Sequence, residues 1–398
     1  MIPRELAPLL QSVARQYPVV TLTGPRQSGK TTLVRATFPG HEYASLEEPD
    51  VRQFALEDPR GFLGQFAGGV IFDEVQRAPD LFSYIQTRVD REDVPGRYIL
   101  SGSQNFLLLR SISQSLAGRS AILHLLPLSL SELQERAPFP LEKLGSKAPD
   151  RTRDRPGNLM EVLLQGFYPR IHDKGLDPSM WYSGYYQTYV ERDVREIVNV
   201  GDLESFGRFV RLCAGRNGQL LNLTSLANDC GITHTTARRW LSILEASFLV
   251  YLLRPYHASF GKRLIKSPKL YFLDPGLLCY LLRIQSPEDL RLHASRGAIF
   301  ETFVISELLK GFYHRGQEPA VYFWRDSTGH EIDAVIDRGS EKIALEIKSA
   351  QTIAEDFFAG LDLWRKLVGD PEAPAALVYG GDQSYRRRGV AVWSWSAL

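Results

Sequence analysis

The residues best suited to chemistry lie near the N-terminus, in "TLTGPRQSGKTTLVRATF" (residues 21–38). Gly24, Gly29, Lys30 and Thr31 have the spacing G-x-x-x-x-G-K-[ST] of a phosphate-binding loop. The glycines permit backbone angles and close approaches that a side chain would block, so that amide hydrogens can point at a phosphate. Lys30 is expected to reach the β- and γ-phosphates of a nucleotide, and Thr31 to supply a hydroxyl to Mg²⁺. The residues expected to contact the nucleotide are Gly24, Pro25, Arg26, Gln27, Ser28, Gly29, Lys30, Thr31 and Thr32.

A pair of acids some 40 residues later provides the second half of a nucleotide-hydrolysing site. The apolar run of "GGVIFDEVQ" is typical of a buried parallel strand and ends in Asp73 and Glu74. Asp73 is expected to hold Mg²⁺, directly or through water. Glu74 is expected to orient and deprotonate the attacking water.

Four further polar side chains are candidates to complete that site. In "RYILSGSQN" the strand pattern ends in Ser103 and Gln104, either of which could sense the γ-phosphate. Arg119, after Gly118, could act as an arginine finger in a neighbouring subunit, and Arg110 is the competing candidate. Ordinary pairing of both arginines with local acids is an equally good interpretation.

The composition narrows the class of protein. Among 398 residues, 44% are hydrophobic and 23% charged, which is ordinary for a globular protein of two to four domains. Since the net charge is +1, affinity for nucleic acid would have to come from local patches. The three cysteines are widely spaced, which predicts neither a disulfide framework nor a zinc site. With no signal peptide and no run of about 20 apolar residues, we expect a cytoplasmic protein without membrane contact.

The patterning divides the chain into four segments. Residues 1–126 alternate strands and helices, which predicts a parallel sheet with flanking helices. No guanine-recognition motif is present, so adenine is the expected base and ATP the expected nucleotide. Residues 127–205 are helical in pattern, with a charged break at 145–158. Residues 206–262 and 263–398 carry the two remaining signals.

The first of these signals is a helix-turn-helix in "LTSLANDCGITHTTARRWLSIL". Small residues at Ala227 and Gly231 allow two helices to cross and turn, and "ASFLVYLLRPY" then supplies the strand of a wing. The second helix would present hydroxyl and basic side chains to phosphates and base edges of DNA. The expected DNA-contacting residues are Thr235, Thr236, Arg238 and Arg239. A winged helix used only for protein contacts is the alternative.

The second signal is a set of carboxylates and a lysine. Asp333 lies in one expected strand, and Glu346 and Lys348 alternate on the next, which puts the latter two on one face. Glu301 lies on the preceding helix. Converging carboxylates, Asp333 and Glu346 above all, would bind Mg²⁺, and Lys348 would stabilise charge on a phosphate during hydrolysis. Ordinary charged strand residues are the alternative.

These motifs carry a family resemblance. Through "GPRQSGKTT", "VIFDEVQ" and "ILSGSQNF" the N-terminal part resembles the AAA+ ATPases, and through "GHEIDAVID" and "ALEIKSA" the last third resembles the PD-(D/E)XK, or restriction-endonuclease-like, superfamily. The whole chain is similar to bacterial and archaeal ATP-binding proteins in which an AAA+ domain precedes a domain of unknown function containing a winged helix. No sensor-2 arginine motif stands out in the lid.

The resemblance implies an α/β chain of four parts: an AAA+ P-loop core (1–126), a helical lid (127–205), a winged helix-turn-helix (206–262) and a nuclease-like domain (263–398). It also implies an ATP-dependent, DNA-binding ATPase, acting on branched or broken DNA in repair and processing or in defence against foreign DNA. ATP and Mg²⁺ are the expected cofactors. The expected partners are branched or single-strand-containing DNA and further copies of the chain, as in a hexamer. The alternative is a nucleotide-controlled switch with an inactive nuclease-like domain, whose winged helix binds protein or promoter DNA.

Overall fold

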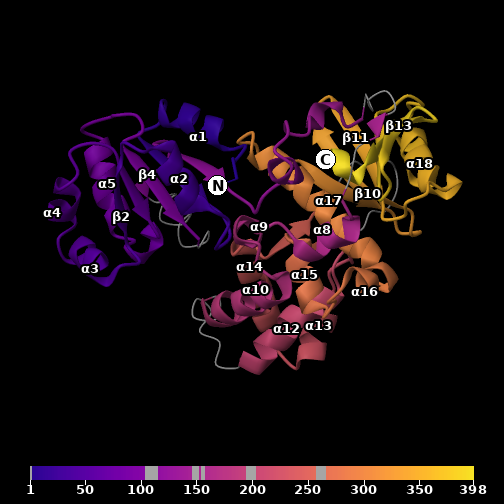
Figure 1. Ribbon diagram of the computed structural model, residues 1–398, viewed down its shortest axis with the longest axis horizontal. Helices are drawn as coiled ribbons and strands as arrows, with labels where there is room; N and C mark the ends of the chain where they lie inside the picture. The colour runs from indigo at the N-terminus through magenta and orange to yellow at the C-terminus, as the bar shows by residue number, and fades with distance from the viewer. Residues whose placement is uncertain (1, 104–114, 146–151, 154–156, 194–202, 257–265) are drawn as a thin grey trace. The chain divides into compact units, whose positions relative to one another are not determined.

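The computed structural model describes two compact units (Figure 1). The described residues are 2–103, 115–145, 152–153, 157–193, 203–256 and 266–398. The N-terminal unit contains Met1–Leu128, Ala246–Phe248 and Tyr313–Gln317. The C-terminal unit contains Ser129–Glu245, Leu249–Phe312 and Glu318–Leu398.

The N-terminal unit is built on a five-stranded sheet whose strands are all parallel, in the order β2-β3-β4-β1-β5. The parallel sheet predicted from the alternation of strands and helices is therefore confirmed. Its strands are β1 (Val19–Thr23), β2 (Glu42–Ser45), β3 (Val70–Asp73), β4 (Tyr98–Gly102) and β5 (Ser120–His124). β1 lies between β4 and β5, so the loop that follows it leaves from the interior of the sheet.

Helices cover both faces of this sheet. Alternate residues of each strand point to opposite faces, so they pack against different helices. Val20 and Ile71 pack in one apolar cluster with α1 and α2, whereas Val19, Val70 and Phe72 pack in another with α3 to α5. Burial on both faces explains why β3 is continuously apolar from Val70 to Phe72. The helical elements are α1 (Ala7–Ala14), α2 (Lys30–Thr37), α3 (Pro49–Glu57), α4 (Pro59–Gly64), the 3₁₀ turn η1 (Val75–Arg77) and α5 (Leu81–Val89).

The C-terminal unit begins with a largely helical region. It contains α7 (Leu130–Leu133), η2 (Leu141–Lys143), α8 (Leu159–Gln165), α9 (Pro169–Lys174), α10 (Pro178–Tyr185), the π-helix η3 (Tyr186–Asp193), α12 (Leu203–Gly215), α13 (Leu223–Cys230), α14 (His234–Ala246), α15 (Pro275–Leu281) and α16 (Pro287–Leu292). Between α14 and α15, β7 (Val250–Leu253) and β8 (Lys269–Phe272) pair as an antiparallel ribbon.

The rest of this unit is a seven-stranded mixed sheet in the order β6-β13-β14-β12-β11-β10-β9. The interior strand β11 pairs antiparallel with β10 and parallel with β12. The elements are β6 (Thr152–Arg153), α17 (Arg296–Tyr313), β9 (Val321–Arg325), β10 (Glu331–Arg338), β11 (Glu341–Lys348), η4 (Glu355–Phe358), α18 (Ala359–Val368), β12 (Ala375–Tyr379), β13 (Gln383–Arg387), β14 (Val390–Ser394) and η5 (Trp395–Ala397). Trp364 of α18 packs on one face of this sheet with Ala344 and Leu377.

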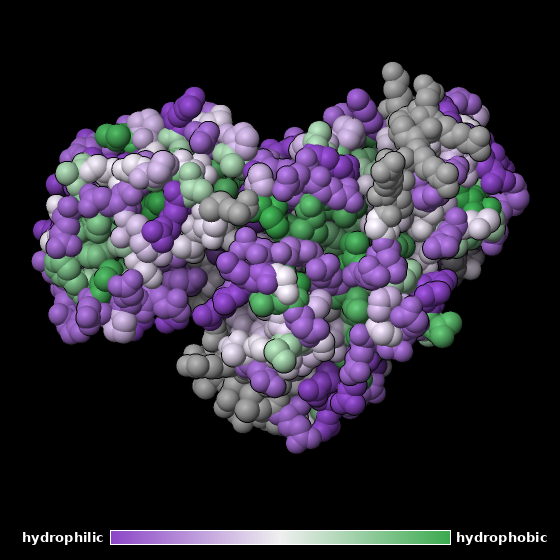
Figure 2. Space-filling model, viewed as in Figure 1, coloured by the Kyte–Doolittle hydropathy of each residue, from purple (hydrophilic) through white to green (hydrophobic). Residues whose placement is uncertain are grey.

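Hydrophilic residues cover much of the molecular face in Figure 2, and apolar residues reach it in separate patches. None of the helices that the structure describes is long and apolar enough to cross a membrane.

Candidate functional site

The phosphate-binding loop connects β1 to α2. Gly24 has φ +155° and Gly29, which caps α2, has φ +92°. A Cβ atom on Gly24 would lie 2.1 Å from the carbonyl oxygen of Leu125, so a side chain there would displace the chain after β5. Both glycines are thus required by the local backbone. Of the other loop residues, Pro25 and Ser28 are buried, Gln27 and Thr32 are exposed, and the Arg26 guanidinium lies 3.5 Å from Glu47.

Two basic side chains form hydrogen bonds with the backbone of this loop. Lys30 Nζ donates hydrogen bonds to the carbonyl oxygens of Gly24 (3.0 Å) and Pro25 (2.8 Å). Burial lowers the pKa of Lys30 to about 8, although the nearby Glu74 carboxylate opposes that shift. Arg4 donates to the Ser28 carbonyl (2.6 Å) and also to the chain after β5, at Leu126 (2.7 Å). Arg4 was not predicted, because nothing in its sequence position links it to the loop.

Asp73, at the end of β3, accepts hydrogen bonds from three hydroxyl groups. Asp73 Oδ2 accepts hydrogen bonds from Thr31 Oγ1 (2.7 Å) and from the Tyr43 hydroxyl (3.0 Å). Asp73 Oδ1 accepts a hydrogen bond from Ser101 Oγ. Burial, followed by the Asp73 charge, raises the pKa of Tyr43 to about 12. The structure thus brings together Thr31 and Asp73, the two expected magnesium ligands of this site. Their hydroxyl and carboxylate oxygens are the hard donors that Mg²⁺ prefers.

The neighbouring Glu74 carboxylate is held separately from Asp73. Glu74 has φ +53°, a left-handed conformation that is uncommon for a residue with a side chain. Gln76 Nε2 donates to Glu74 Oε2 at 2.5 Å, and Ser103 Oγ donates to the same oxygen at 3.2 Å. Ser103 therefore lies next to the expected general base, whereas Gln104 lies outside the described residues. Gln76 was not predicted.

Of the two arginine-finger candidates, Arg119 lies among the described residues and follows Gly118, just before β5. Arg119 Nε donates to Asp90 Oδ1 at 2.5 Å, and both side chains are partly exposed. This contact is the local pairing that the sequence left open. An exposed pair of this kind contributes only about 0–1 kcal/mol, so it does not prevent Arg119 from contacting a nucleotide in another subunit. Arg110 lies outside the described residues.

The helix-turn-helix residues lie on α13 and α14, which are joined at Gly231 in a left-handed conformation (φ +70°). Ala237 and Trp240 are buried in the core of the helix pair. The opposite side of α14 presents Arg238 and Arg239, both exposed and neither paired with a carboxylate among the described residues. Thr235 is also exposed, and Thr236 is half-buried with its backbone N–H capped by the Thr233 hydroxyl (3.1 Å).

In the C-terminal sheet, Asp333, Glu346 and Lys348 are in direct contact. Lys348 Nζ lies 2.6 Å from Glu346 Oε2 and 3.0 Å from Asp333 Oδ2, and the Ile347 N–H also donates to Asp333 (2.8 Å). The pairing of β10 with β9 shifts register between Ile332 and Val335, which places an irregularity at Asp333. Bulges of this kind commonly re-aim a side chain at a functional site.

Each residue of this trio has a pKa that is affected by the charge of at least one of the other two. Burial, followed by the Asp333 charge, raises the pKa of Glu346 to about 8. For Asp333, burial is outweighed by Lys348 and Lys269, which hold its pKa below the ordinary value. On α18, Gly360 leaves the room that Glu346 needs, because a Cβ atom there would lie 2.1 Å from Glu346 Oε1.

Glu301, on α17, has a different set of partners. Tyr271 donates to Glu301 Oε1 at 2.5 Å, and Lys269 Nζ lies 3.3 Å from the same oxygen. Lys269 also pairs with Glu331, which Arg325 contacts at 2.8 Å. Burial raises the pKa of Glu301 to about 7, with Lys269 opposing and Asp333 adding to the shift. Within the described residues, no group of three or more His, Cys, Asp or Glu side chains is arranged to hold a metal ion.

The sequence did not predict Lys269, Tyr271 or Glu331 as members of this charged cluster. The only signal for the first two was the alternation of polar and apolar residues in "KLYF", the β8 strand. Their proximity to Glu301 arises from the packing of the β7–β8 ribbon, which spacing along the chain does not reveal.

Comparison with known proteins supports the N-terminal assignment. A family model described as "AAA domain" matches residues 16–134. Models described as domains of unknown function, DUF8612 and DUF4143, match residues 157–288 and 296–398. Among solved structures, the Walker-type ATPase of Pyrococcus abyssi aligns with a TM-score of 0.42 and 16% identity, over 71% of this chain and 96% of that one.

Two uncharacterized proteins, from Mycobacterium bovis and Mycobacterium tuberculosis, are each 32% identical to this chain over 383 residues. The alignment covers 96% of this chain and 81% of each relative. The chain therefore belongs to the same family as these two mycobacterial proteins, and it combines an AAA-type ATPase domain with a C-terminal DUF4143 domain.

Proposed function

We propose that this protein uses ATP to act on DNA, with a winged helix that binds the DNA and a C-terminal nuclease-like domain that engages or cuts it. The observation that carries the proposal is the contact of Lys348 with both Asp333 and Glu346. These residues lie in an α17-β9-β10-β11-α18-β12 succession, the helix and strand order expected of a PD-(D/E)XK domain. Branched or broken DNA is the proposed substrate, and a homo-oligomer the proposed active form.

At the nucleotide site, the residues divide the work of hydrolysis. The loop amides and Lys30 would bind the phosphates, and Thr31 and Asp73 would hold Mg²⁺, which neutralises phosphate charge when bound. Glu74 Oε2, held by Gln76 and Ser103, would accept the proton of the attacking water. Arg119 would stabilise the developing charge from a neighbouring subunit once it leaves Asp90.

At the C-terminal site, Asp333 and Glu346 would hold Mg²⁺, since this ion commonly uses one or two carboxylates and completes its shell with water and substrate oxygens. When bound, the ion would polarise the scissile phosphate. Glu346 fits this role, because burial and then the neighbouring Asp333 charge raise its pKa, and a bound cation would favour the charged form. Lys348 would orient water or stabilise the charge that develops on the phosphate, and Glu301 would assist from α17.

DNA contact is proposed for α14. The elements α13, α14 and the β7–β8 ribbon have the order of a winged helix, with α14 in the position of the recognition helix. Arg238 and Arg239 have no acidic partner within the described chain, so their charges are available for phosphates. Thr235 and Thr236 would add hydroxyl contacts.

One observation favours a second function, a nucleotide-controlled switch with a retired nuclease fold. Glu301 is engaged by Lys269 and Tyr271, and no three acidic side chains of the described residues converge on a metal position. In this alternative the winged helix binds protein or promoter DNA, and slow hydrolysis of ATP serves as a timer.

The two functions separate in one set of assays. ATP hydrolysis and DNA cleavage are measured with single-stranded, duplex, forked and four-way DNA, in the presence of Mg²⁺. A DNA-acting ATPase should hydrolyse ATP faster with DNA, to an extent that depends on the DNA structure. A turnover rate that no DNA changes would favour the switch.

A further inference from the structure

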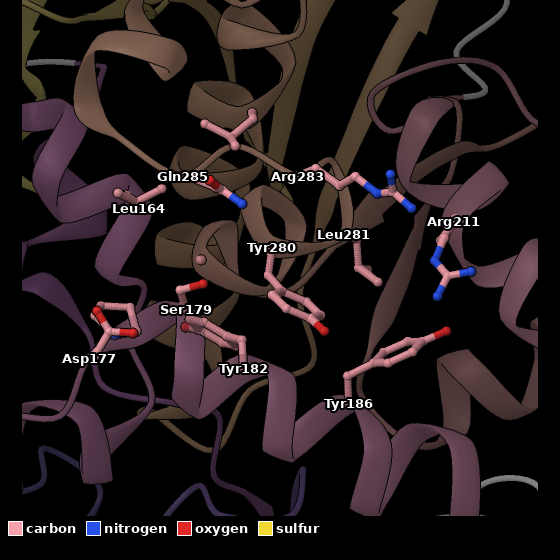
Figure 3. A pocket seen from close by; sticks show the side chains of 13 residues that line it. Leu164, Asp177, Ser179, Tyr182, Tyr186, Arg211, Tyr280, Leu281, Arg283 and Gln285 are labelled. Carbon is pink, nitrogen blue, oxygen red and sulfur yellow. The ribbon is translucent and has the colours of Figure 1, made fainter.

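A cavity of about 440 Å³ lies in the helical part of the C-terminal unit (Figure 3). It is lined by residues of α8, α10, the π-helix, α12 and α15, and by the segment that follows α15. None of its lining residues belongs to the nucleotide site or to the group of Glu301, Asp333, Glu346 and Lys348. Its volume lies within the range of small-molecule sites, roughly 300–1,000 Å³.

One side of this cavity is cationic. In Figure 3 the guanidinium groups of Arg211 and Arg283 lie on the same side of the cavity, and so does the hydroxyl of Tyr186. Arg211 lies over the Tyr186 ring, 5.8 Å from its centroid. Neither arginine pairs with a carboxylate in the described part of the chain. Two guanidinium groups without acidic partners are suited to a phosphate, which they can bind through several donors.

The opposite side carries hydrogen-bonding groups of another kind. Asp177, Ser179 and Gln285 lie there in Figure 3. Asp177 Oδ1 caps α10 by accepting from the Met180 N–H (2.7 Å), and its other oxygen has no hydrogen bond among the described residues. This side therefore offers acceptors for the N–H groups of a ligand.

Aromatic rings connect the two sides. The Tyr280 ring lies between them in Figure 3, with its centroid 6.1 Å from that of Tyr186. Tyr182, which also lines the cavity, donates its hydroxyl hydrogen to the buried Asp274 (2.6 Å). A planar ring can stack on Tyr280 while its substituents reach both sides, as bases commonly stack on aromatic side chains.

We propose that this cavity binds one nucleotide unit, with the phosphate on Arg211 and Arg283, the base on Tyr280 and the base edge on Asp177 and Gln285. A phenyl ring would leave the acceptors opposite the arginines without donors, whereas a nucleobase supplies them. The nucleotide is either a free mononucleotide or one residue of a single strand. Neither source depends on the phosphate-binding loop or on α14.

Binding is measured by calorimetry on the full chain carrying Lys30→Ala, which weakens the competing ATP site. The probes are adenosine 5′-monophosphate, adenosine, inorganic phosphate, and a short single strand with and without a 5′-phosphate. Adenosine monophosphate should bind more tightly than adenosine or phosphate. Arg283→Ala and Tyr280→Ala should each weaken it about tenfold or more, as expected for a lost charged hydrogen bond or a lost stacking partner. Tyr280→Phe, which keeps the ring, should bind almost as the parent does.

Arg170, exposed on α9 and outside the cavity lining, provides the matched control, and Arg170→Ala should change nothing. A single strand that binds through the same two residues, where the mononucleotide does not, would support the strand as the source. Phosphate binding as tightly as the mononucleotide, or variants indistinguishable from the parent, would overturn the proposal. Loss of DNA binding in Arg238→Ala/Arg239→Ala with mononucleotide binding retained would separate this site from the proposed winged helix.

Discussion

Lys269 Nζ lies 3.3 Å from Glu301 Oε1, so a strand of the β7–β8 ribbon contacts the helix that precedes the C-terminal sheet. The neighbouring Tyr271 donates to the same carboxylate oxygen at 2.5 Å. The ribbon that follows α14 therefore contacts Glu301 directly. Any displacement of the ribbon would change the hydrogen bonds of Glu301.

The first prediction concerns the stability of this contact. Tyr271→Phe removes the hydroxyl that stabilises the Glu301 carboxylate and should lower the free energy of unfolding by about 1.5–3 kcal/mol. Urea unfolding measures the change. Tyr251→Phe is the matched control: Tyr251 pairs across the ribbon with Tyr271, and its hydroxyl has no partner among the described residues. Equal losses in both variants would mean that the Glu301 contact adds nothing.

The second prediction separates the two roles in ATP hydrolysis. Lys30→Ala should abolish turnover by removing the phosphate-binding charge. Glu74→Gln should keep ATP binding and lower turnover about a hundredfold or more, because the general base is lost. Nucleotide binding and phosphate release are measured on both variants. Wild-type turnover of Glu74→Gln would exclude Glu74 as the base.

The third prediction is a pH dependence of nucleotide affinity. Because burial lowers the pKa of Lys30 from 10.5 to about 8, the lysine is charged below about pH 8 and loses its proton above it. ATP needs the charged form, so its affinity should be constant below about pH 8 and fall by up to about tenfold per pH unit above it. Measuring the ATP affinity between about pH 7 and about pH 10, a range that includes this pKa, tests the prediction. Lys30→Arg stays charged over this range and should bind with a flatter profile; the same slope in both proteins would contradict the assignment.

The fourth prediction tests α14. Changing Arg238 and Arg239 together to alanine should weaken DNA binding and reduce its salt dependence by about one to two units of slope. Binding is measured over a series of salt concentrations. Because both side chains are exposed, the fold should be unaffected. An unchanged isotherm at every salt concentration would assign the helix-turn-helix to protein contacts.

The fifth prediction concerns cleavage. Wild-type protein with Mg²⁺ or Mn²⁺ should cut DNA, and Asp333→Ala and Lys348→Ala should each lose that activity while remaining folded. Circular dichroism of each variant controls for folding. Cleavage that survives in both variants would place the active centre elsewhere. If neither the wild type nor any variant cuts DNA but all of them still bind it, the domain would act as a DNA clamp without nuclease activity.

The parts of the two sites that depend on local spacing were predictable. The loop from Gly24 to Thr31 and the Glu346–Lys348 alternation are set by neighbours in the chain, so the sequence shows them directly. Arg4 and Tyr43 were missed, because their contacts depend on how distant segments pack around the loop and Asp73. The same holds for Lys269, whose contact with Glu301 spans 32 positions.

The N-terminal unit is completed by Tyr313–Gln317, far along the chain. His314 Nδ1 lies 2.9 Å from Glu5 Oε2, and the Tyr313 ring centroid lies 4.9 Å from that of His124. A ribosome adding 5–20 residues per second needs roughly 10 to 40 seconds to reach this segment after it finishes β5. During that interval the N-terminal unit lacks the partners of Glu5 and His124, so it cannot complete these contacts until most of the chain has been synthesised.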